Sequence, residues 1–521
     1  MPPDAGDAFI FHLQGDKWND YGYVTLFHAT LFKEGQEYSL GAIRILVDEQ
    51  SSTADALRNF TGYAIADFFV RTSQLFVSLG NSLNYYRALK SNLRPHLRES
   101  ILQTMHDAAY LQIRTPHSAS LELRNTEGFR KSLLRSLSEK QAFEEAAQVI
   151  FGRKRRRNRS FDISYDLRGE QPRQSLNFDF SPSRNYPANI NLLIGSNGTG
   201  KTQALKSIVA AMIDRGFLSE KEQLAVSDLN PRVTSTGGFS HIVAVSYTPF
   251  EDFPTARSSV GLASEQYQYC GFRTFENIRG ESILQAAPSQ LAELHRLDQQ
   301  SVIKGETSRF ETFISAMKDG LDFDELWLTI GSWTSEILWS KREPIMPSHI
   351  EFSGESALTF ARKGQAVKLS AGQTIFVGLL LSILRYIKQN ALLLVDEPEL
   401  YLHANLEVQL ITILRTLLQR YNAFAIIATH SPIMAREVPR QRTWILRRSS
   451  DGAINAYRPP FQTFGADLTR IINYVFDDLL LTHPYVAWLQ ERLVAIGSVE
   501  NIIDDDMSME LKVLLRSLRR D

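Results

Sequence analysis

The sequence predicts an α/β protein whose core is a mostly parallel sheet, and three stretches carry this prediction. The apolar run "INLLIG" leads into the glycine-rich loop "GSNGTGKT" (Gly195 to Thr202), and apolar residues at helical spacing follow it. The apolar runs "ALLLV" and "AFAIIAT" end in Asp396 and Glu397 and in His430, respectively. Strands buried on both faces read as continuous apolar runs, and ligands bind at the carboxyl ends of parallel strands. We therefore expect these residues to meet at one edge of the sheet.

The amino-acid composition limits the classes of protein to which this chain can belong. A chain of 521 residues with 43% hydrophobic and 22% charged residues is typical of a globular protein with several domains. The net charge of -1 excludes a global electrostatic attraction to nucleic acid or membranes. Cys270 is the only cysteine, so an internal disulfide is impossible, and no apolar run approaches the ~20 residues that span a bilayer. The first residues lack the features of a signal peptide, and we expect a cytoplasmic protein with no membrane partner.

The loop "GSNGTGKT" fits the phosphate-binding pattern G-x-x-x-x-G-K-[ST] in full. Its backbone N–H groups are expected to cradle nucleotide phosphates, and the start of the following helix adds a partial positive charge. Lys201 would neutralise the β- and γ-phosphate oxygens, and Thr202 would offer a hydroxyl to Mg²⁺. A chance glycine-rich turn is disfavoured because a strand and a helix flank the loop. The predicted nucleotide-binding residues of this P-loop are Gly195, Ser196, Asn197, Gly198, Thr199, Gly200, Lys201 and Thr202.

The acidic pair in "ALLLVDEPEL" supplies the second half of a nucleotide site. Asp396 would hold Mg²⁺, and Glu397 would orient or deprotonate the attacking water. An acidic pair after an apolar run is often only the exit of a strand. A P-loop in the same chain favours the functional interpretation.

The run "KLSAGQ" starts a helix with one buried apolar face, and Ser370 is placed as its N-cap. A serine hydroxyl and glycine amides at a helix N-terminus form a phosphate-binding device. The core "LSAGQ" resembles the L-S-G-G-Q-like signature of the ABC-type ATPases. That resemblance implies a homodimer with two shared sites for ATP and Mg²⁺. In each site the signature of one subunit closes over the γ-phosphate held by the P-loop of the other, and its residues here are Ser370, Ala371, Gly372 and Gln373.

His430 fits the motif order of the same family, in which a histidine at this place contacts the γ-phosphate and steadies the water. A lone histidine at a strand end is otherwise more often structural. The run "DEPE-x-x-LH" resembles the SMC, RecF and OLD-like branch more than the transporter ATPases, and it would place His403 at the dimer seam. One departure is that no glutamine ends the strand at 242–247, where a Q-loop would begin. Gln266 and Gln268 are weak substitutes for it.

The residues before the P-loop combine strands with a helical block. The runs "YGYVTLFHATLF" and "GAIRILVDE" alternate as strands do, and an ABC fold would use such strands in its antiparallel β subdomain. Helices are expected over 56–89 and 97–113. "SLGNSLNYYRAL" (Ser78 to Leu89), together with "WNDYGYVTLFHATL", resembles the N-terminal region of PtuA-type ATPases of Septu and retron-associated antiphage systems. That resemblance implies a bacterial defence complex with a separately encoded nuclease effector of the HNH or Toprim kind.

Other segments narrow the prediction further. No heptad pattern is sustained between Gln203 and Lys368, so a compact helical lobe is expected rather than a coiled-coil arm. The tail after His430 reads mostly as helices, and the aspartates at 504–506 fit a helix start better than a metal site. No nuclease is therefore assigned to this chain. The basic run "GRKRRRNRSF", with Arg153 to Arg157, is either a solvated connector or a contact for nucleic-acid phosphates or an acidic partner.

The expected fold is an ABC-type P-loop ATPase head with a mostly parallel sheet core, an antiparallel β subdomain and a helical lobe. An N-terminal α-rich extension and a helical C-terminal tail are added to this head. The expected domains are a strand and helical extension at 1–160, a P-loop lobe at 161–270 and a helical lobe at 271–365, followed by the signature, acidic-pair and His430 lobe at 366–460 and the tail at 461–521.

The predicted function is an ATPase subunit of an antiphage complex, which dimerises around ATP and controls its nuclease effector by nucleotide state. A RecF-like repair ATPase that binds DNA directly is the first alternative. A non-hydrolysing ATP-sensing switch is the second, and a transporter subunit is disfavoured by the "DEPELYLH" run.

Overall fold

Two compact units make up the chain, Met1–Gly465 and Ala466–Asp521, and each is described by itself. The computed structural model describes residues 9–16, 22–48, 50–53, 55–56, 75–152, 159–167, 172–213, 227–234, 238–246, 248, 253–254, 266–271, 283–300, 308–321, 323–330, 333–336, 356–449, 451–476, 484–496, 499, 502–504 and 506–518.

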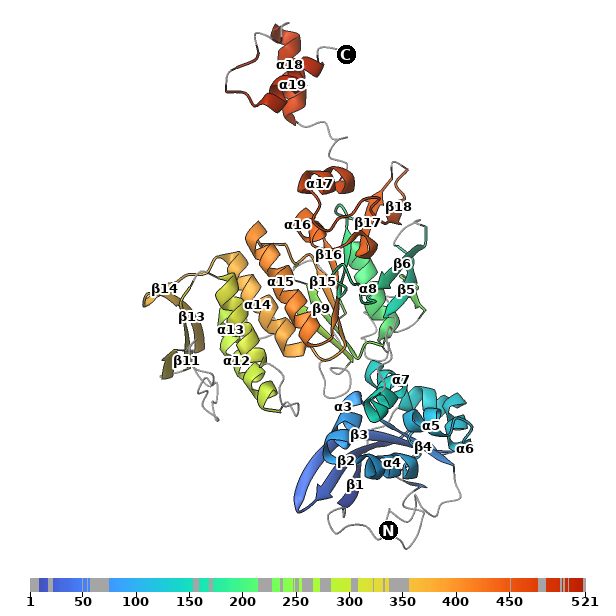
Figure 1. Ribbon diagram of the computed structural model, residues 1–521. Helices are drawn as coiled ribbons and strands as arrows, with labels where there is room; N and C mark the ends of the chain where they lie inside the picture. Colours follow the sequence, from blue (N-terminus) through green and yellow to red (C-terminus); the bar gives the residue numbers. More distant parts are fainter. Residues whose placement is uncertain are drawn as a thin grey trace. The chain divides into compact units, whose positions relative to one another are not determined.

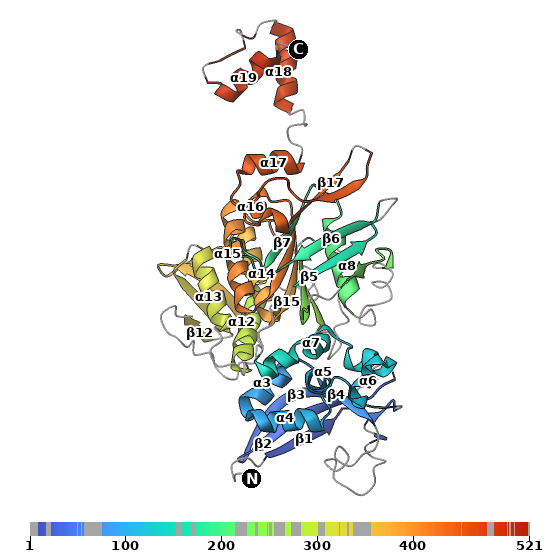
Figure 2. The same cartoon turned by 45° about the vertical axis from the view of Figure 1, so that its right-hand side comes forward.

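A seven-stranded sheet forms the centre of the first unit, in the order β10-β9-β15-β16-β7-β17-β18. Every neighbouring pair is parallel except β17 and β18, which confirms the predicted sheet. The helix α8 lies on one face, and α14 and α15 lie on the other (Figures 1 and 2). Both faces are thus covered, which explains why strands such as β15 and β16 are entirely buried and are apolar up to their last residues, Asp396 and Thr429. The bounds are β7 (Ile190–Ile194), α8 (Lys201–Met212), β9 (His241–Ser246), β10 (Tyr267–Gly271), α14 (Ala371–Tyr386), β15 (Ala391–Asp396), α15 (Ala404–Arg420), β16 (Phe424–Thr429), α16 (Pro432–Arg436), the short η4 (Arg440–Arg442), β17 (Thr443–Arg448) and β18 (Ile454–Tyr457).

A small antiparallel sheet, β6-β5-β8, packs against α8. The strand β5 alternates, with Phe161, Ile163 and Tyr165 buried and the intervening residues less so. The predicted antiparallel β subdomain is therefore built by β5 (Ser160–Tyr165), β6 (Gln174–Asp179) and β8 (Arg232–Val233).

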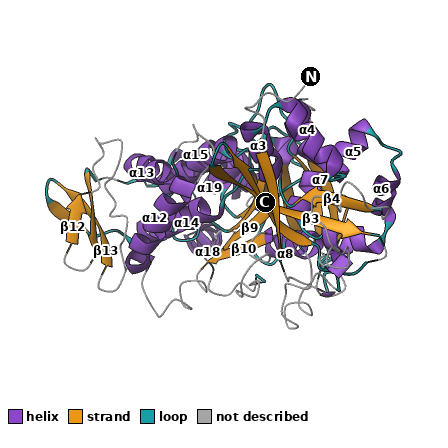
Figure 3. Ribbon diagram, turned by 90° about the horizontal axis from the view of Figure 1, so that it is seen from below, coloured by secondary structure: helices purple, strands orange, loops and turns teal. Residues whose placement is uncertain are grey.

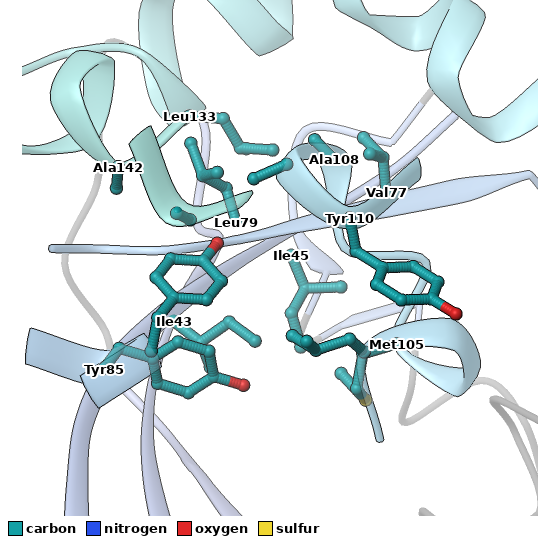
Figure 4. Close-up of a cluster of buried hydrophobic side chains, with 14 of the residues drawn as sticks. Ile43, Ile45, Val77, Leu79, Tyr85, Met105, Ala108, Tyr110, Leu133 and Ala142 are labelled. Atoms are coloured by element: carbon teal, nitrogen blue, oxygen red, sulfur yellow. The ribbon is translucent and has the colours of Figure 1, made fainter. Parts of the chain in front are cut away.

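The N-terminal part forms a sheet of its own, β1-β2-β3-β4, in which every neighbouring pair is antiparallel. Helices pack on it around a separate hydrophobic core, whose side chains in Figure 4 include Ile43, Ile45, Val77 and Leu79. These strands therefore do not join the sheet of β5. The elements are β1 (Phe9–Gly15), β2 (Leu26–Lys33), β3 (Gln36–Val47), β4 (Phe76–Gly80), α3 (Leu83–Asn92), α4 (Pro95–Thr104), α5 (Ala108–Arg114), α6 (Ala119–Glu122), η1 (Leu123–Asn125), η2 (Phe129–Leu133) and α7 (Leu137–Phe151).

The prediction of a helix through Phe76–Gly80 is wrong, because these residues form β4 and pair with β3. All five residues of "FVSLG" are buried, and a short, mostly apolar run does not distinguish a buried strand from a buried helix. Residues 57–74 of the same expected helix lie outside the described part of the chain.

A buried carboxyl group, Asp107, ties this N-terminal subdomain together. Its Oδ1 accepts the backbone N–H of Tyr110 at 2.9 Å as the N-cap of α5, and its Oδ2 accepts the Tyr86 hydroxyl at 2.7 Å. Desolvation raises the pKa of Asp107 from 3.8 to about 7, although the hydrogen bonds from Tyr86 and the backbone act in the opposite direction. The folded state therefore keeps a proton that the unfolded chain has already lost at pH 5 to 6.

We expect the free energy of unfolding of this subdomain to fall as the pH rises from about 4 to about 7, by about 4 kcal/mol in total. The stabilisation is fully present below the unfolded pKa and is lost through the folded pKa. Asp107→Asn keeps the N-cap and stays neutral, so this pH dependence should disappear. Urea denaturation followed by circular dichroism at pH 5 and pH 8 measures it, with Glu37→Gln, an exposed residue of β3, as the control. Equal slopes for wild type and Asp107→Asn would contradict the prediction.

The lobe between β10 and α14 is only partly helical. Two helices occur where they were expected, but they pack with a four-stranded antiparallel sheet, β12-β11-β13-β14, that was not predicted (Figure 3). The helical lobe prediction is corrected accordingly. Among the described residues, the buried side chains of these strands are Leu326, Leu328, Leu358, Phe360 and Ala361, which form a narrow buried face. The bounds are α12 (Ile283–Gln300), α13 (Arg309–Gly320), β11 (Glu325–Ile330), β12 (Trp333–Glu336), β13 (Ser356–Arg362) and β14 (Gln365–Val367).

The second unit contains the helices α17 (Leu468–Phe476), α18 (Pro484–Ile496) and α19 (Met509–Leu518). Leu489 of α18 and Leu515 of α19 form a small core with Val499 and Ile502. Across the described helices of both units, none is long and apolar enough to cross a membrane.

Candidate nucleotide site

The P-loop joins the end of β7 to the start of α8. Gly195 lies so close to β17 that a Cβ atom added to it would come within 2.1 Å of the carbonyl oxygen of Leu446. Only glycine fits this approach, which keeps the loop backbone tightly curved beside the sheet. Arg448 braces the loop from the same strand by donating from Nη2 to the carbonyl oxygen of Gly198 at 3.1 Å.

Lys201 points back into the P-loop, and its side chain is only 3% exposed. Its Nζ donates to the carbonyl oxygens of Gly195 at 3.1 Å and Ser196 at 3.2 Å, and it lies 2.8 Å from Nε2 of His430. A buried ammonium group is stable only with such partners. The loop therefore holds a positive charge ready for an anionic ligand.

Thr202 and Asp396 meet across the sheet edge. The hydroxyl of Thr202 lies 3.1 Å from Oδ1 and 3.0 Å from Oδ2 of Asp396, which is buried at the end of β15. A hydroxyl and a carboxylate are oxygen ligands of the kind that Mg²⁺ takes beside nucleotide phosphates. These two residues thus fit the metal that the sequence predicts.

Glu397 and His430 form a second contact at the same edge. Nε2 of His430 lies 2.9 Å from Oε1 of Glu397, and Nζ of Lys201 lies 3.8 Å from the same oxygen. The hydrogen bond with His430 is the main cause that lowers the pKa of Glu397, against the effect of burial. A carboxylate that stays ionised can orient a water molecule or accept its proton.

A single atom of His430, the imidazole Nε2, contacts both Lys201 and Glu397. A neutral Nε2 either accepts a hydrogen bond from Lys201 or donates one to Glu397, and it cannot do both at once. The two contacts therefore compete, and a ligand that attracts Lys201 would release His430 for Glu397.

The signature residues lie at the start of α14. Ser370 Oγ accepts the N–H of Gln373 at 3.2 Å, and Gln373 Oε1 accepts the N–H of Ser370 at 2.9 Å, which forms a capping box. Ser370 and Ala371 are exposed, whereas Gly372 is buried. Among the described residues, the side-chain hydrogen bonds of Ser370 and Gln373 are those of this box, and neither joins the P-loop of the same chain.

The remaining predicted residues are placed as follows. His403 is exposed as the N-cap of α15, and Gln268 Nε2 donates to the carbonyl oxygen of Tyr269. Gln266 directly precedes β10 and is 1% exposed, and its Nε2 has no hydrogen-bond partner among the described residues. The basic run at Arg153 to Arg157 lies outside the described residues.

Two acidic residues near the site were not predicted. Glu399 Oε1 accepts the backbone N–H of His430, and Glu407 Oε2 accepts the hydroxyl of Ser431. The sequence signal for Glu399 is the second acid of "DEPE", but its partner is a backbone group that no sequence motif identifies.

Comparisons with known proteins agree with the ATPase motifs. Residues 345–434 match a family model described as "AAA domain, putative AbiEii toxin, Type IV TA system". Protein ea59 of Escherichia phage lambda is 28% identical to this chain over 536 residues, covering 97% of this chain and 94% of the phage protein.

Solved structures with similar folds include an SMC head bound to the C-terminal winged-helix domain of ScpA, at 15% identity and a TM-score of 0.33. That match covers 58% of this chain and 97% of the other. The SMC head domain of Thermotoga maritima matches at 14% identity and a TM-score of 0.27, with 58% and 98% covered. The strand order, the P-loop between β7 and α8 and the family model give the chain the fold of an ABC/SMC-type ATPase head.

Proposed function

We propose that this chain is a subunit that binds and hydrolyses ATP in the presence of Mg²⁺. One observation carries the proposal: five side chains from the P-loop, the end of β15 and the end of β16 meet at one edge of the sheet, in two contact sets that are adjacent along the chain at 201–202 and 396–397. They are Lys201, Thr202, Asp396, Glu397 and His430.

Each side chain of the cluster has a task in this proposal. ATP supplies the phosphoryl group, and Thr202 and Asp396 would hold the Mg²⁺ that neutralises its oxygens. Lys201 exchanges its loop carbonyl partners for phosphate oxygens, which ends its contact with His430. His430 Nε2–H then donates to Glu397 and orients the carboxylate that positions water.

The exposed start of α14 supports an ATP-dependent homodimer. Ser370 and Ala371 are accessible to a second molecule, and the resemblance to ABC-type ATPases gives them a role at the ATP site of the partner. The dimer would therefore depend on this helix start, whereas ATP binding by a single subunit would depend on the P-loop.

Ser370→Arg should prevent this dimer by placing a bulky side chain at the helix start. We expect ATP-induced dimerisation to be lost and ATP affinity per subunit to stay within about 3-fold of wild type, because a monomer binds ATP through its own P-loop. Analytical ultracentrifugation with and without Mg·ATP measures the dimer. Ser118→Arg, at the N-cap of α6, is the matched control. Equal dimerisation of Ser370→Arg and wild type would contradict the proposed interface.

The wider role that we propose is control of a separately encoded nuclease in an antiphage complex. The "DEPE-x-x-LH" run and the N-terminal resemblance to PtuA-type ATPases support this role. The nucleotide state of the dimer would hold or release the effector. Purification from the native operon tests it: co-purification of a nuclease supports the proposal, and recovery of this chain alone contradicts it.

A further inference from the structure

The turn that carries His430 is held by two acidic side chains from one distant segment. Glu399 Oε1 accepts the backbone N–H of His430, and Glu407 Oε2 accepts the hydroxyl of Ser431. The N–H of Ser431 is bound in turn by Oγ1 of Thr429 at 2.9 Å. The segment from Glu399, in the loop after β15, to Glu407, in the first turn of α15, therefore holds the backbone N–H of His430 and the side chain of the next residue, Ser431.

The burial of Glu399 indicates that this side chain does more than make one hydrogen bond to the backbone. Its Oε2 is buried and has no hydrogen-bond partner among the described residues. Desolvation raises the pKa of Glu399, and the nearby charge of Glu397 raises it further, although the backbone N–H of His430 and the nearby side chain of Thr429 act in the opposite direction. A backbone N–H needs only one neutral acceptor, and a buried acid beside another carboxylate is a costly way to supply it. This free-energy cost of burying an acid is explained if Glu399 is needed to hold His430 in one position.

The same segment also contacts α14, which begins at the signature residues and is called the signature helix below. Tyr401 adopts a left-handed backbone conformation with φ of 73°, and its carbonyl oxygen faces Gly372. A Cβ atom on Gly372 would come within 2.1 Å of this oxygen, so the start of α14 and the segment are in direct backbone contact. A shift of α14 would therefore move the segment that holds His430.

We propose that Glu399 is a positioning residue that sets His430 against Glu397 and connects it to the signature helix. Glu399 accepts the hydrogen bond of the backbone N–H of His430, and the carbonyl oxygen of Tyr401 contacts Gly372. The catalytic consequence rests on the proposed ATPase function. In a dimer, a subunit that engages the start of α14 would thereby adjust the imidazole of the same chain.

Two variants of the full-length protein separate positioning from general stability. Glu399→Gln keeps a carbonyl oxygen for the His430 N–H, whereas Glu399→Ala removes it. Hydrogen exchange without nucleotide should show the His430 amide exchanging about 10-fold faster in Glu399→Ala and unchanged in Glu399→Gln. The kcat for ATP should fall about 10- to 100-fold in Glu399→Ala with KM within about 2-fold, and Glu399→Gln should restore it. Glu99→Ala, which removes an ion pair with Arg114 in the N-terminal subdomain, is the control.

The outcomes distinguish this inference from the proposed function. Wild-type exchange at His430 in Glu399→Ala overturns the inference, as does an equal loss of kcat in the Ala and Gln variants. If wild type hydrolyses no ATP, the ATPase proposal fails, but the exchange comparison still decides whether Glu399 holds the turn. If Glu399→Ala does not fold, Glu399→Met removes the acceptor while it keeps most of the side-chain volume, and the same comparison applies.

Discussion

Lys201→Ala should weaken Mg·ATP binding by about 100-fold or more, because two or more charge-assisted hydrogen bonds to phosphate are lost at once. The structure makes this variant informative. Nζ of Lys201 contacts two carbonyl oxygens of the loop and Nε2 of His430 after β16, so the substitution removes the ammonium group at the centre of these contacts and leaves a short neutral side chain. Isothermal titration calorimetry with ATP in the presence of Mg²⁺ measures the affinity.

The matched control is Lys206→Ala, one and a half turns further along α8. Its ammonium lies over the ring of Phe253, 5.6 Å from the ring centroid, which gives it a surrounding different from that of Lys201. Lys206→Ala should bind ATP like wild type. Unchanged ATP affinity in Lys201→Ala, or no binding by wild type, would remove the basis of the ATPase proposal.

Glu397→Gln should reduce kcat for ATP hydrolysis by about 100- to 10,000-fold, the range typical of a lost general base. The amide keeps the size of the side chain and an oxygen for the His430 Nε2–H, but it cannot accept a proton from water. ATP affinity should stay close to wild type, and the ATP-bound dimer should accumulate. Phosphate release and sedimentation in Mg·ATP measure the two effects, and Glu99→Gln serves as the control.

The kcat of Glu397→Gln also distinguishes a protein that hydrolyses ATP from one that only senses it. A protein that only senses ATP would show no turnover to lose, and Glu397→Gln would leave its effect on a partner unchanged. A proton-accepting role for Glu397 further predicts that kcat declines as the pH falls through its lowered pKa, because the protonated form cannot act as a base. Turnover that is equal in Glu397→Gln and wild type would contradict the role given to this residue.

The central sheet could be predicted from the sequence because its strands are unambiguous. The mostly apolar runs of β7, β15 and β16 end at a glycine-rich loop, an acidic pair and a histidine, respectively, and each boundary is set by local chemistry. Parallel pairing then brings the strand ends to one edge. This is why Lys201, Asp396 and His430 lie together although they are far apart in the chain.

Other features depend on contacts between distant segments, which local patterns do not encode. "FVSLG" reads equally well as helix or strand until β3 is present to pair with it. The sheet of β11 to β14 has a narrow buried face, so its alternation is weak in the sequence. Glu399 is visible as an acid, but its bond to the backbone of His430 requires the strands β15 and β16 to be neighbours.

The separate hydrophobic core of the N-terminal subdomain has a consequence for how the protein melts. The side chains around β3 and β4 pack with one another, and the aromatic and aliphatic residues around α8 form another cluster. Two parts of a protein unfold cooperatively when the unfolding of one removes side-chain contacts that stabilise the other. Two separate hydrophobic cores share few such contacts. Calorimetry should therefore show overlapping transitions, of which ATP would shift only the one that contains the P-loop. A single melting temperature then does not describe the stability of this chain.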